Sequence, residues 1–94
     1  MDIAKSDLVK STAGRDRDSL FFVLATEGDF LLLADGKHRR LENPKRKRKK
    51  HVALVSPGQG AVAEKIKASE KITNIELRKA IAAFSGGNSD QEGQ

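Results

Sequence analysis

Six consecutive cations are the strongest chemical feature of this sequence. They run from Lys45 to Lys50 in the order KRKRKK and follow Pro44 directly. Adjacent positive charges repel one another, and this repulsion is relieved when phosphates replace their diffuse counterions. We therefore expect the run to contact an RNA or DNA backbone. Two other interpretations stay open: a solvated loop that keeps the chain soluble, and a nuclear localisation signal.

Other basic residues could extend this contact. Lys37, Arg39 and Arg40 lie close to the run in the sequence, although edge strands also carry such charges to block unwanted pairing. Arg15 and Arg17 lie in a glycine-containing loop that could present them to a phosphate, although their acidic neighbours could equally neutralise the turn. The expected RNA-binding residues are Lys45, Arg46, Lys47, Arg48, Lys49, Lys50, Lys37, Arg39, Arg40, Arg15 and Arg17.

The sequence offers no recognisable set of catalytic or metal-binding residues. His38 and His51 are embedded among cations, neither belongs to a recognisable set of acid, base and nucleophile, and Glu42 is the one carboxylate between them. There is no cysteine, so thiolate metal sites and cysteine nucleophiles are excluded. We therefore expect a protein that is not an enzyme and has no cofactor, metal ion or small-molecule substrate.

The distribution of charge favours a polyanionic partner on one side of the molecule. The chain has 94 residues and a formal charge of +5, yet residues 37–51 hold nine Lys or Arg residues and one acidic residue, so the remainder is mildly acidic. The absence of cysteine agrees with a reducing compartment. The apolar runs are too short to cross a bilayer or to act as a signal peptide. We expect a cytoplasmic protein that does not enter membranes.

Short hydrophobic runs bounded by turn residues predict five strands and a small barrel. Asp35-Gly36 is a strong hairpin signal, which predicts that the chain folds back directly after it and that Arg39 and Arg40 point to opposite faces of a strand. All the aromatic residues are phenylalanines within apolar patterns, so we expect them in the core and do not expect base stacking. The predicted strands are Leu8 to Thr12, Leu20 to Thr26, Phe30 to Ala34, Lys37 to Glu42 and His51 to Val55.

The C-terminal part predicts a helix that covers the sheet. Thr73 and Glu76 have the spacing of a capping box. The apolar residues that follow fall on one stripe, and Gly86-Gly87 is expected to end the helix. A shorter helix is expected within residues 61–70, and residues 88–94 are polar enough to predict disorder. The stripe consists of Leu77, Ala80, Ile81 and Phe84.

Residues 5–56 resemble the KOW motif and its surroundings in ribosomal proteins and transcription elongation factors, and the end of the C-terminal helix resembles them less closely. The resemblance rests on Asp7-Leu8-Val9, on Gly14 and on the strand from Leu20 to Val23. The continuation from Phe30 to Lys37 resembles large-subunit ribosomal proteins of the "L fourteen e" type. The basic segment after Pro44 and the element from Thr73 to Ala80 are similar to bacterial KOW-domain RNA-binding proteins. The KOW-motif residues are Asp7, Val9, Gly14 and Val23.

This resemblance implies a mainly β fold, a five-stranded SH3-like barrel with a helical C-terminal extension, that contacts ribosomal RNA through its loop and basic extensions. Asp18 and Ser19 stand where family members usually carry glycine and a basic residue, which makes the run of six cations the main expected contact. We expect residues 1–58 to form the barrel with its basic segment at 44–51, residues 59–85 to form the helical extension and residues 86–94 to be a disordered tail.

The leading functional interpretation is an RNA-binding protein associated with the ribosome and translation. Its partners would be ribosomal RNA, or another structured RNA, and the ribosome or a ribosomal protein. One alternative is an adaptor of the translation or transcription machinery that docks on a protein through the barrel or through the Leu77, Ile81 and Phe84 stripe. Another is an architectural protein that binds duplex DNA.

Overall fold

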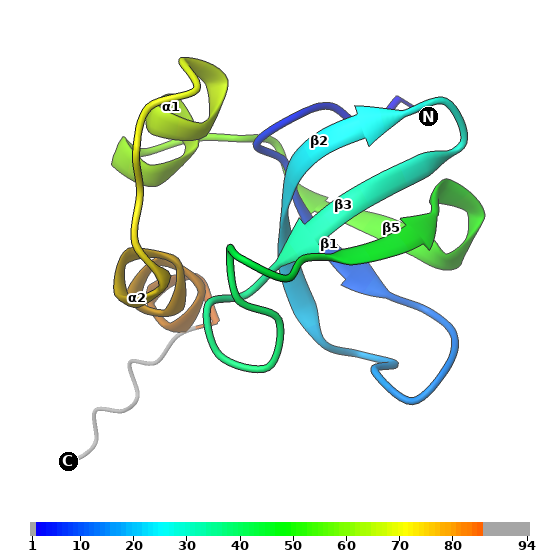
Figure 1. Ribbon diagram of the computed structural model, residues 1–94. Coiled ribbons are helices and arrows are strands. Elements are labelled where there is room, and N and C mark those ends of the chain that lie inside the picture. The colour runs from blue at the N-terminus through cyan, green and yellow to red at the C-terminus, as the bar shows by residue number, and fades with distance from the viewer. Residues whose placement is uncertain (1, 86–94) are drawn as a thin grey trace, which may run out of the picture.

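The computed structural model describes residues 2–85, which form a five-stranded sheet and two α-helices (Figure 1). A single turn of 3₁₀-helix, η1, joins the fourth and fifth strands. The expected mainly β fold with a helical extension is therefore confirmed. The elements are β1 (Leu8–Ser11), β2 (Leu20–Glu27), β3 (Phe30–Ala34), β4 (Lys45–Arg48), η1 (Lys49–His51), β5 (Val52–Ser56), α1 (Ala61–Lys67) and α2 (Asn74–Phe84).

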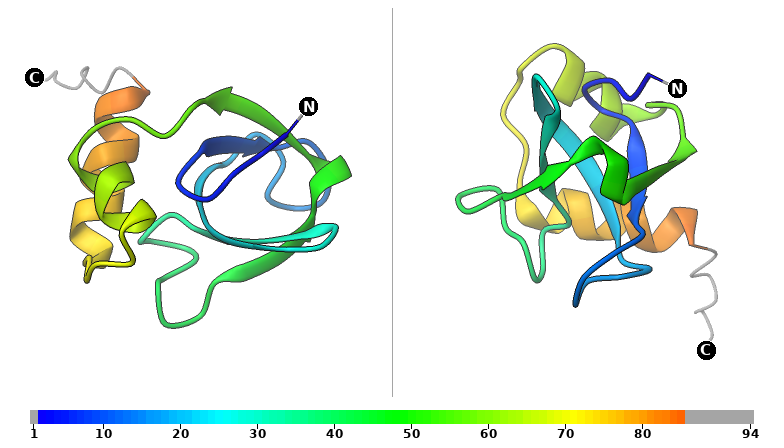
Figure 2. Two further views of the ribbon diagram at one scale, coloured as in Figure 1. Left: turned by 90° about the horizontal axis from the view of Figure 1, so that it is seen from above. Right: turned by 90° about the vertical axis from the view of Figure 1, so that its right-hand side faces the viewer.

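The strands pair antiparallel in the order β4-β3-β2-β1-β5. The register shifts between Val23 and Ala25 on β2 and between Leu8 and Val9 on β1, and such bulges increase the local twist and bend of a sheet. The sheet curls strongly, as the view from above shows (Figure 2). The hydrogen-bonded ladder ends at β4 and β5, so the sheet is open.

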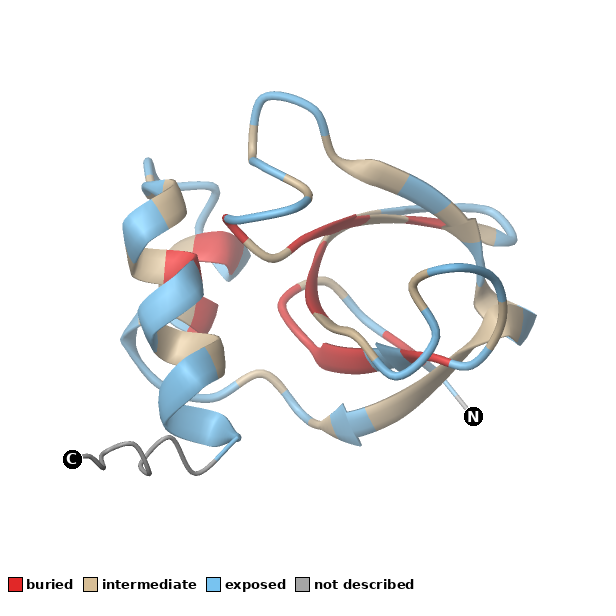
Figure 3. Cartoon of the chain, turned by 90° about the horizontal axis from the view of Figure 1, so that it is seen from below, coloured by how far each residue is buried: buried red, intermediate tan, exposed pale blue. Residues whose placement is uncertain are grey.

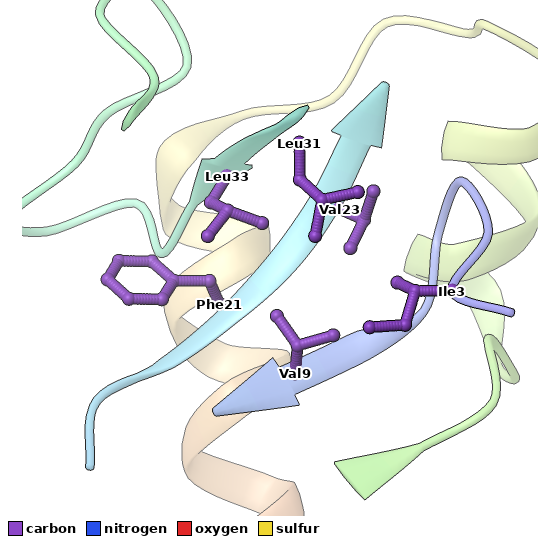
Figure 4. Packing of buried hydrophobic residues seen from close by; sticks show 6 residues of the cluster. All are labelled: Ile3, Val9, Phe21, Val23, Leu31 and Leu33. Carbon is purple, nitrogen blue, oxygen red and sulfur yellow. The ribbon is translucent and has the colours of Figure 1, made fainter. Parts of the chain in front are cut away.

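The concave side of the sheet holds the first hydrophobic core. Strand alternation places Phe21 and Val23 on the same side as Leu31 and Leu33, and Val9 of β1 meets them (Figure 4). All five side chains are almost completely buried. Ile3 and the partly buried residues of β5 complete this cluster.

The helices cover the opposite side of the sheet. Leu8, Phe22 and Ala34 are paired neighbours across β1, β2 and β3, and they pack against Ile66 of α1 and Leu77 of α2. The helix residues coloured as buried lie toward the sheet (Figure 3). Both sides of these strands are thus buried, which explains why β2 and β3 have apolar runs without polar alternation.

Helix α2 begins with the predicted capping box. The Glu76 N–H donates to the Thr73 hydroxyl at 3.1 Å, and the Thr73 N–H donates to Glu76 Oε1 at 2.8 Å. Lys65 of α1 donates to Glu76 Oε2 at 2.8 Å, so the same carboxylate joins the two helices. This bond is the main reason why the pKa of Glu76 lies below its usual value.

We expect Thr73→Ala to lower the free energy of unfolding by about 1 kcal/mol, because the substitution leaves an N–H at the helix start without its acceptor. Urea titration followed by circular dichroism measures the change. Thr73→Ser keeps the hydroxyl and should remain close to the parent protein. Equal losses for both substitutions would show that the hydroxyl has no capping role.

The predicted fourth strand is wrong. Residues 35–44 form an irregular loop, and the strand lies in the basic run itself. The Asp35 carboxylate accepts the N–H groups of Lys37 at 2.9 Å and Arg39 at 2.8 Å, which shapes the loop. The loop then docks on the start of α2, where Asn74 Oδ1 accepts the Leu41 N–H at 2.7 Å.

Gly36 serves a close contact with helix α2 and not a two-residue hairpin turn. Its φ is +81°, and a Cβ at this position would overlap the Asn74 carbonyl group. The glycine therefore serves the close approach of the loop to α2. This role depends on a contact 38 positions along the chain, which the local sequence does not reveal.

Two phenylalanines differ from the expectation that they lie in the core. Phe30 is partly exposed and belongs to neither hydrophobic cluster, and Phe84 at the end of α2 is 48% exposed. Phe21 and Phe22 are buried, as predicted. The predicted helix stop at Gly86-Gly87 and the predicted disordered tail lie outside the described residues. Within residues 2–85, no helix is long and apolar enough to cross a membrane.

Candidate nucleic-acid interface

Strand geometry divides the six cations of the basic run. Lys45 and Lys47 pair with Leu33 and Leu31, so they lie on the concave side of the sheet. Arg46 and Arg48 alternate with them and lie on the outer side. Lys49 and Lys50 belong to η1. The expected continuous row of six cations is therefore replaced by separate inner and outer groups.

The inner lysines bind one carboxylate, that of Asp16 in the loop between β1 and β2. Lys47 Nζ lies 2.9 Å from Asp16 Oδ1, and Lys45 Nζ lies at an ion-pair distance of 3.2 Å from Oδ2 without hydrogen-bond geometry. Lys47 also donates to the Ala13 carbonyl oxygen at 2.8 Å, and the Ser11 hydroxyl donates to Asp16 Oδ1 at 2.8 Å. These contacts tie the loop to edge strand β4.

This cluster is shielded from water and stays ionised. The side chains of Lys47 and Asp16 are only 10% and 16% exposed. Burial raises the pKa of Asp16, but the hydrogen bonds from Lys47 and Ser11 and the nearby ammonium group of Lys45 together outweigh burial and hold that pKa well below its usual range. Lys45 and Lys47 are therefore engaged inside the protein, which leaves fewer free cations than the sequence suggests.

The outer group is built around Phe30, the first residue of β3. We define the outer cation face as Arg46, Arg48, Lys49 and Lys50. The guanidinium carbon of Arg46 lies 3.7 Å from the centroid of the Phe30 ring, and that of Arg48 lies 5.0 Å from it, both within cation–π range. The sequence could have predicted the contact of Phe30 with these arginines only if β3 and β4 had been recognised as neighbouring strands.

Two carboxylates of the β2–β3 turn border the outer cation face. Arg46 Nε donates to Glu27 Oε1 at 3.3 Å. The Lys49 N–H donates to the Asp29 carbonyl oxygen at 2.8 Å, which holds η1 against the turn. A cavity of about 240 Å³ lies between Asp29 and three cations of the face, Arg48, Lys49 and Lys50. Among residues 2–85, none of these three cations has a carboxylate within ion-pair distance.

Other predicted site residues gather at a second place. Arg15, Arg39 and Lys45 line a pocket of about 380 Å³ between the loop after β1 and the loop after β3. Asp16 and Asp35 line the same pocket, so its charge is mixed. The structure thus brings Arg15 and Arg39 together, although Arg39 lies in a loop and not on a strand.

The remaining predicted residues lie in neither group. Arg40 pairs with Glu42 at 3.2 Å on the surface, and Glu42 also accepts a bond from Asn74 Nδ2, the main cause of the lowered pKa of Glu42. Lys37 is exposed in the loop after β3. Arg17 is exposed in the loop after β1 and has no carboxylate partner among the described residues.

Four residues on which the resemblance to the KOW motif rests have positions that shape the fold. Val9 and Val23 are fully buried in the concave core. The Asp7 carboxylate is nearly buried and accepts the N–H groups of Ala4 at 2.9 Å and of Gly58 at 3.0 Å. Gly14 has a φ of +87° in the loop that carries Asp16.

No protein-family model matches the sequence, and no curated protein matches it significantly. In the described part of the chain, His, Asp and Glu side chains form no cluster of three or more that could hold a metal ion.

Proposed function

We propose that this protein binds RNA by placing the outer cation face against phosphates, and that it does so as a KOW-type, SH3-like module of the ribosome or translation machinery. The observation that carries the proposal is the position of Arg48, Lys49 and Lys50. They lie side by side at the end of β4, around a cavity, and no carboxylate within residues 2–85 pairs with them. Phosphates that bind there release condensed counterions.

The backbone around these cations supports a binding role. β4 pairs with β3 along its length, and η1 is hydrogen-bonded to the β2–β3 turn. Cations held on such a frame lose less conformational entropy on binding than cations of a free loop. The proposed role is binding, with no catalytic step, in the cytoplasm.

The architecture supports the KOW-type assignment. Five short antiparallel strands curl around a core that includes Val9 and Val23. The Asp16 cluster joins the loop after β1 to edge strand β4. A barrel-like unit of this kind presents loops and an edge strand to its ligand, as small RNA-binding barrels do.

The direct test is an equilibrium titration of a structured RNA with a triple variant, Arg48→Gln, Lys49→Gln and Lys50→Gln. If each cation meets one phosphate, affinity should fall about 100-fold at physiological salt. A matched control removes three cations from the helical side, Lys71→Gln, Arg78→Gln and Lys79→Gln, and changes net charge equally. Equal losses in the two variants would indicate general electrostatic attraction and contradict the assigned surface.

One observation favours a second candidate, protein docking. A groove of about 440 Å³ lies between the linker after β5 and α2, and the apolar side chains of Phe22, Val62 and Phe84 contribute to its lining. Phe84 is about half exposed there. If the triple variant still sediments with ribosomes after losing its affinity for RNA, docking through this groove replaces phosphate binding as the main interaction.

A further inference from the structure

Phe30 is an aromatic residue that the fold does not use as core. It follows the β2–β3 turn, where Gly28 has a φ of +60°. It is partly exposed on the outer side of the sheet and belongs to neither hydrophobic cluster. Its ring is instead close to the guanidinium groups of Arg46 and Arg48. An aromatic ring and two arginines therefore share one exposed position.

The guanidinium group of Arg46 is held in a fixed orientation. The Phe30 ring lies 3.7 Å from its central carbon, and the Glu27 carboxylate accepts a bond from its Nε at 3.3 Å. The Arg46 side chain is nevertheless 56% exposed. A planar guanidinium group that is already oriented and in contact with solvent is a surface on which a nucleic-acid base can stack.

The phosphate-binding cations lie next to this stack. Arg48 belongs to both features, because it approaches the Phe30 ring and also lines the cavity with Lys49 and Lys50. A nucleotide whose phosphate meets these lysines can therefore place its base toward Arg46 and Phe30. Only an unpaired base is free to do so, since the bases of a duplex are stacked and paired inside the helix.

We infer that the Arg46–Phe30 stack is a binding subsite for one unpaired base, so that the protein prefers single-stranded RNA, or the loops and bulges of folded RNA, over duplex RNA. This inference rests on the proposed function and adds the class of RNA. The Phe30 ring and the Arg46 plane carry the preference, and the neighbouring cations supply affinity that is common to both forms of RNA.

The test compares Phe30→Leu with the parent protein on single-stranded and duplex RNA of equal length, with affinity measured by fluorescence anisotropy at one salt concentration. Removal of the ring should weaken single-strand binding roughly tenfold and change duplex binding less than about twofold. Phe30→Tyr keeps the ring and is the matched control, expected to bind as the parent does. Equal effects of Phe30→Leu on both RNAs would overturn the inference.

Arg46→Lys is a second variant that keeps the charge and removes the guanidinium plane. Arg46→Lys should show the same selective loss of affinity for single-stranded RNA. It tests the stacking subsite even if circular dichroism shows that Phe30→Leu is unfolded. A parent protein that binds both RNAs equally, with the Arg48, Lys49 and Lys50 triple variant defective on both, would contradict the stacking subsite alone. A parent protein that binds neither RNA would contradict the proposed function itself.

Discussion

Leu77→Ala should lower the free energy of unfolding by about 3 kcal/mol, because the substitution opens a cavity beneath helix α2. Leu77 is fully buried and packs with Leu8 and Phe22 of the sheet and with Ile66 of α1. Its side chain is the main anchor of α2, the one residue of that helix that is fully buried. Urea titration monitored by circular dichroism measures the change.

The control for this prediction is on the same helix. Ile75 is 53% exposed, so Ile75→Ala should change the free energy of unfolding by less than about 0.5 kcal/mol. A similar small effect of Leu77→Ala would show that α2 does not pack on the sheet. The burial of Leu77 also means that a docking partner cannot contact it, and Phe84 at the end of the predicted stripe is the stripe residue most open to a partner.

Asp16→Asn should also cost about 3 kcal/mol, because it removes the carboxylate from two lysines, one of which is nearly buried. The uncompensated charge of Lys47 accounts for much of this loss. The double variant Asp16→Asn with Lys47→Met removes that charge and should recover part of the lost stability. If the double variant loses as much free energy of unfolding as Asp16→Asn and Lys47→Met lose together as single variants, the two residues do not interact.

The same cluster predicts a dependence of stability on pH. The folded-state pKa of Asp16 lies well below its unfolded value, so its stabilising contribution is complete above the unfolded value of about 4 and is lost as pH falls toward the folded value. The parent protein should therefore lose stability between about pH 5 and about pH 2 more steeply than Asp16→Asn. Parallel curves for the two proteins would show that this carboxylate carries no such contribution.

Local patterns in the sequence predicted the elements that local chemistry determines. The strands around the turn at Glu27 to Asp29 and the capping box at Thr73 depend on neighbouring residues, and both are present. The covering of the sheet by α2 followed from the apolar stripe, except that Phe84 at its end is exposed.

The site could not be predicted to the same extent, because long-range contacts shape it. A run of Lys and Arg has a low preference for strands, yet β4 forms there because β3 pairs with it and Asp16 neutralises its inner lysines. Asp16 was expected only to weaken the field around Arg15 and Arg17. Once β4 is known to be a strand, the alternation of its residues accounts for which of its four cations face the concave side and which face outward.

The most direct measurement of the central claim is the salt dependence of RNA affinity. If Arg48, Lys49 and Lys50 each meet one phosphate, a plot of log affinity against log salt should have a slope of about −2.1 for single-stranded RNA to about −2.7 for a duplex, which corresponds to roughly 20-fold to 40-fold weaker binding between about 50 and about 200 mM salt. The triple variant should lose most of that slope, while the matched helical variant should keep it. A parent protein that binds RNA with little dependence on salt, or a triple variant with an unchanged slope, would contradict the account.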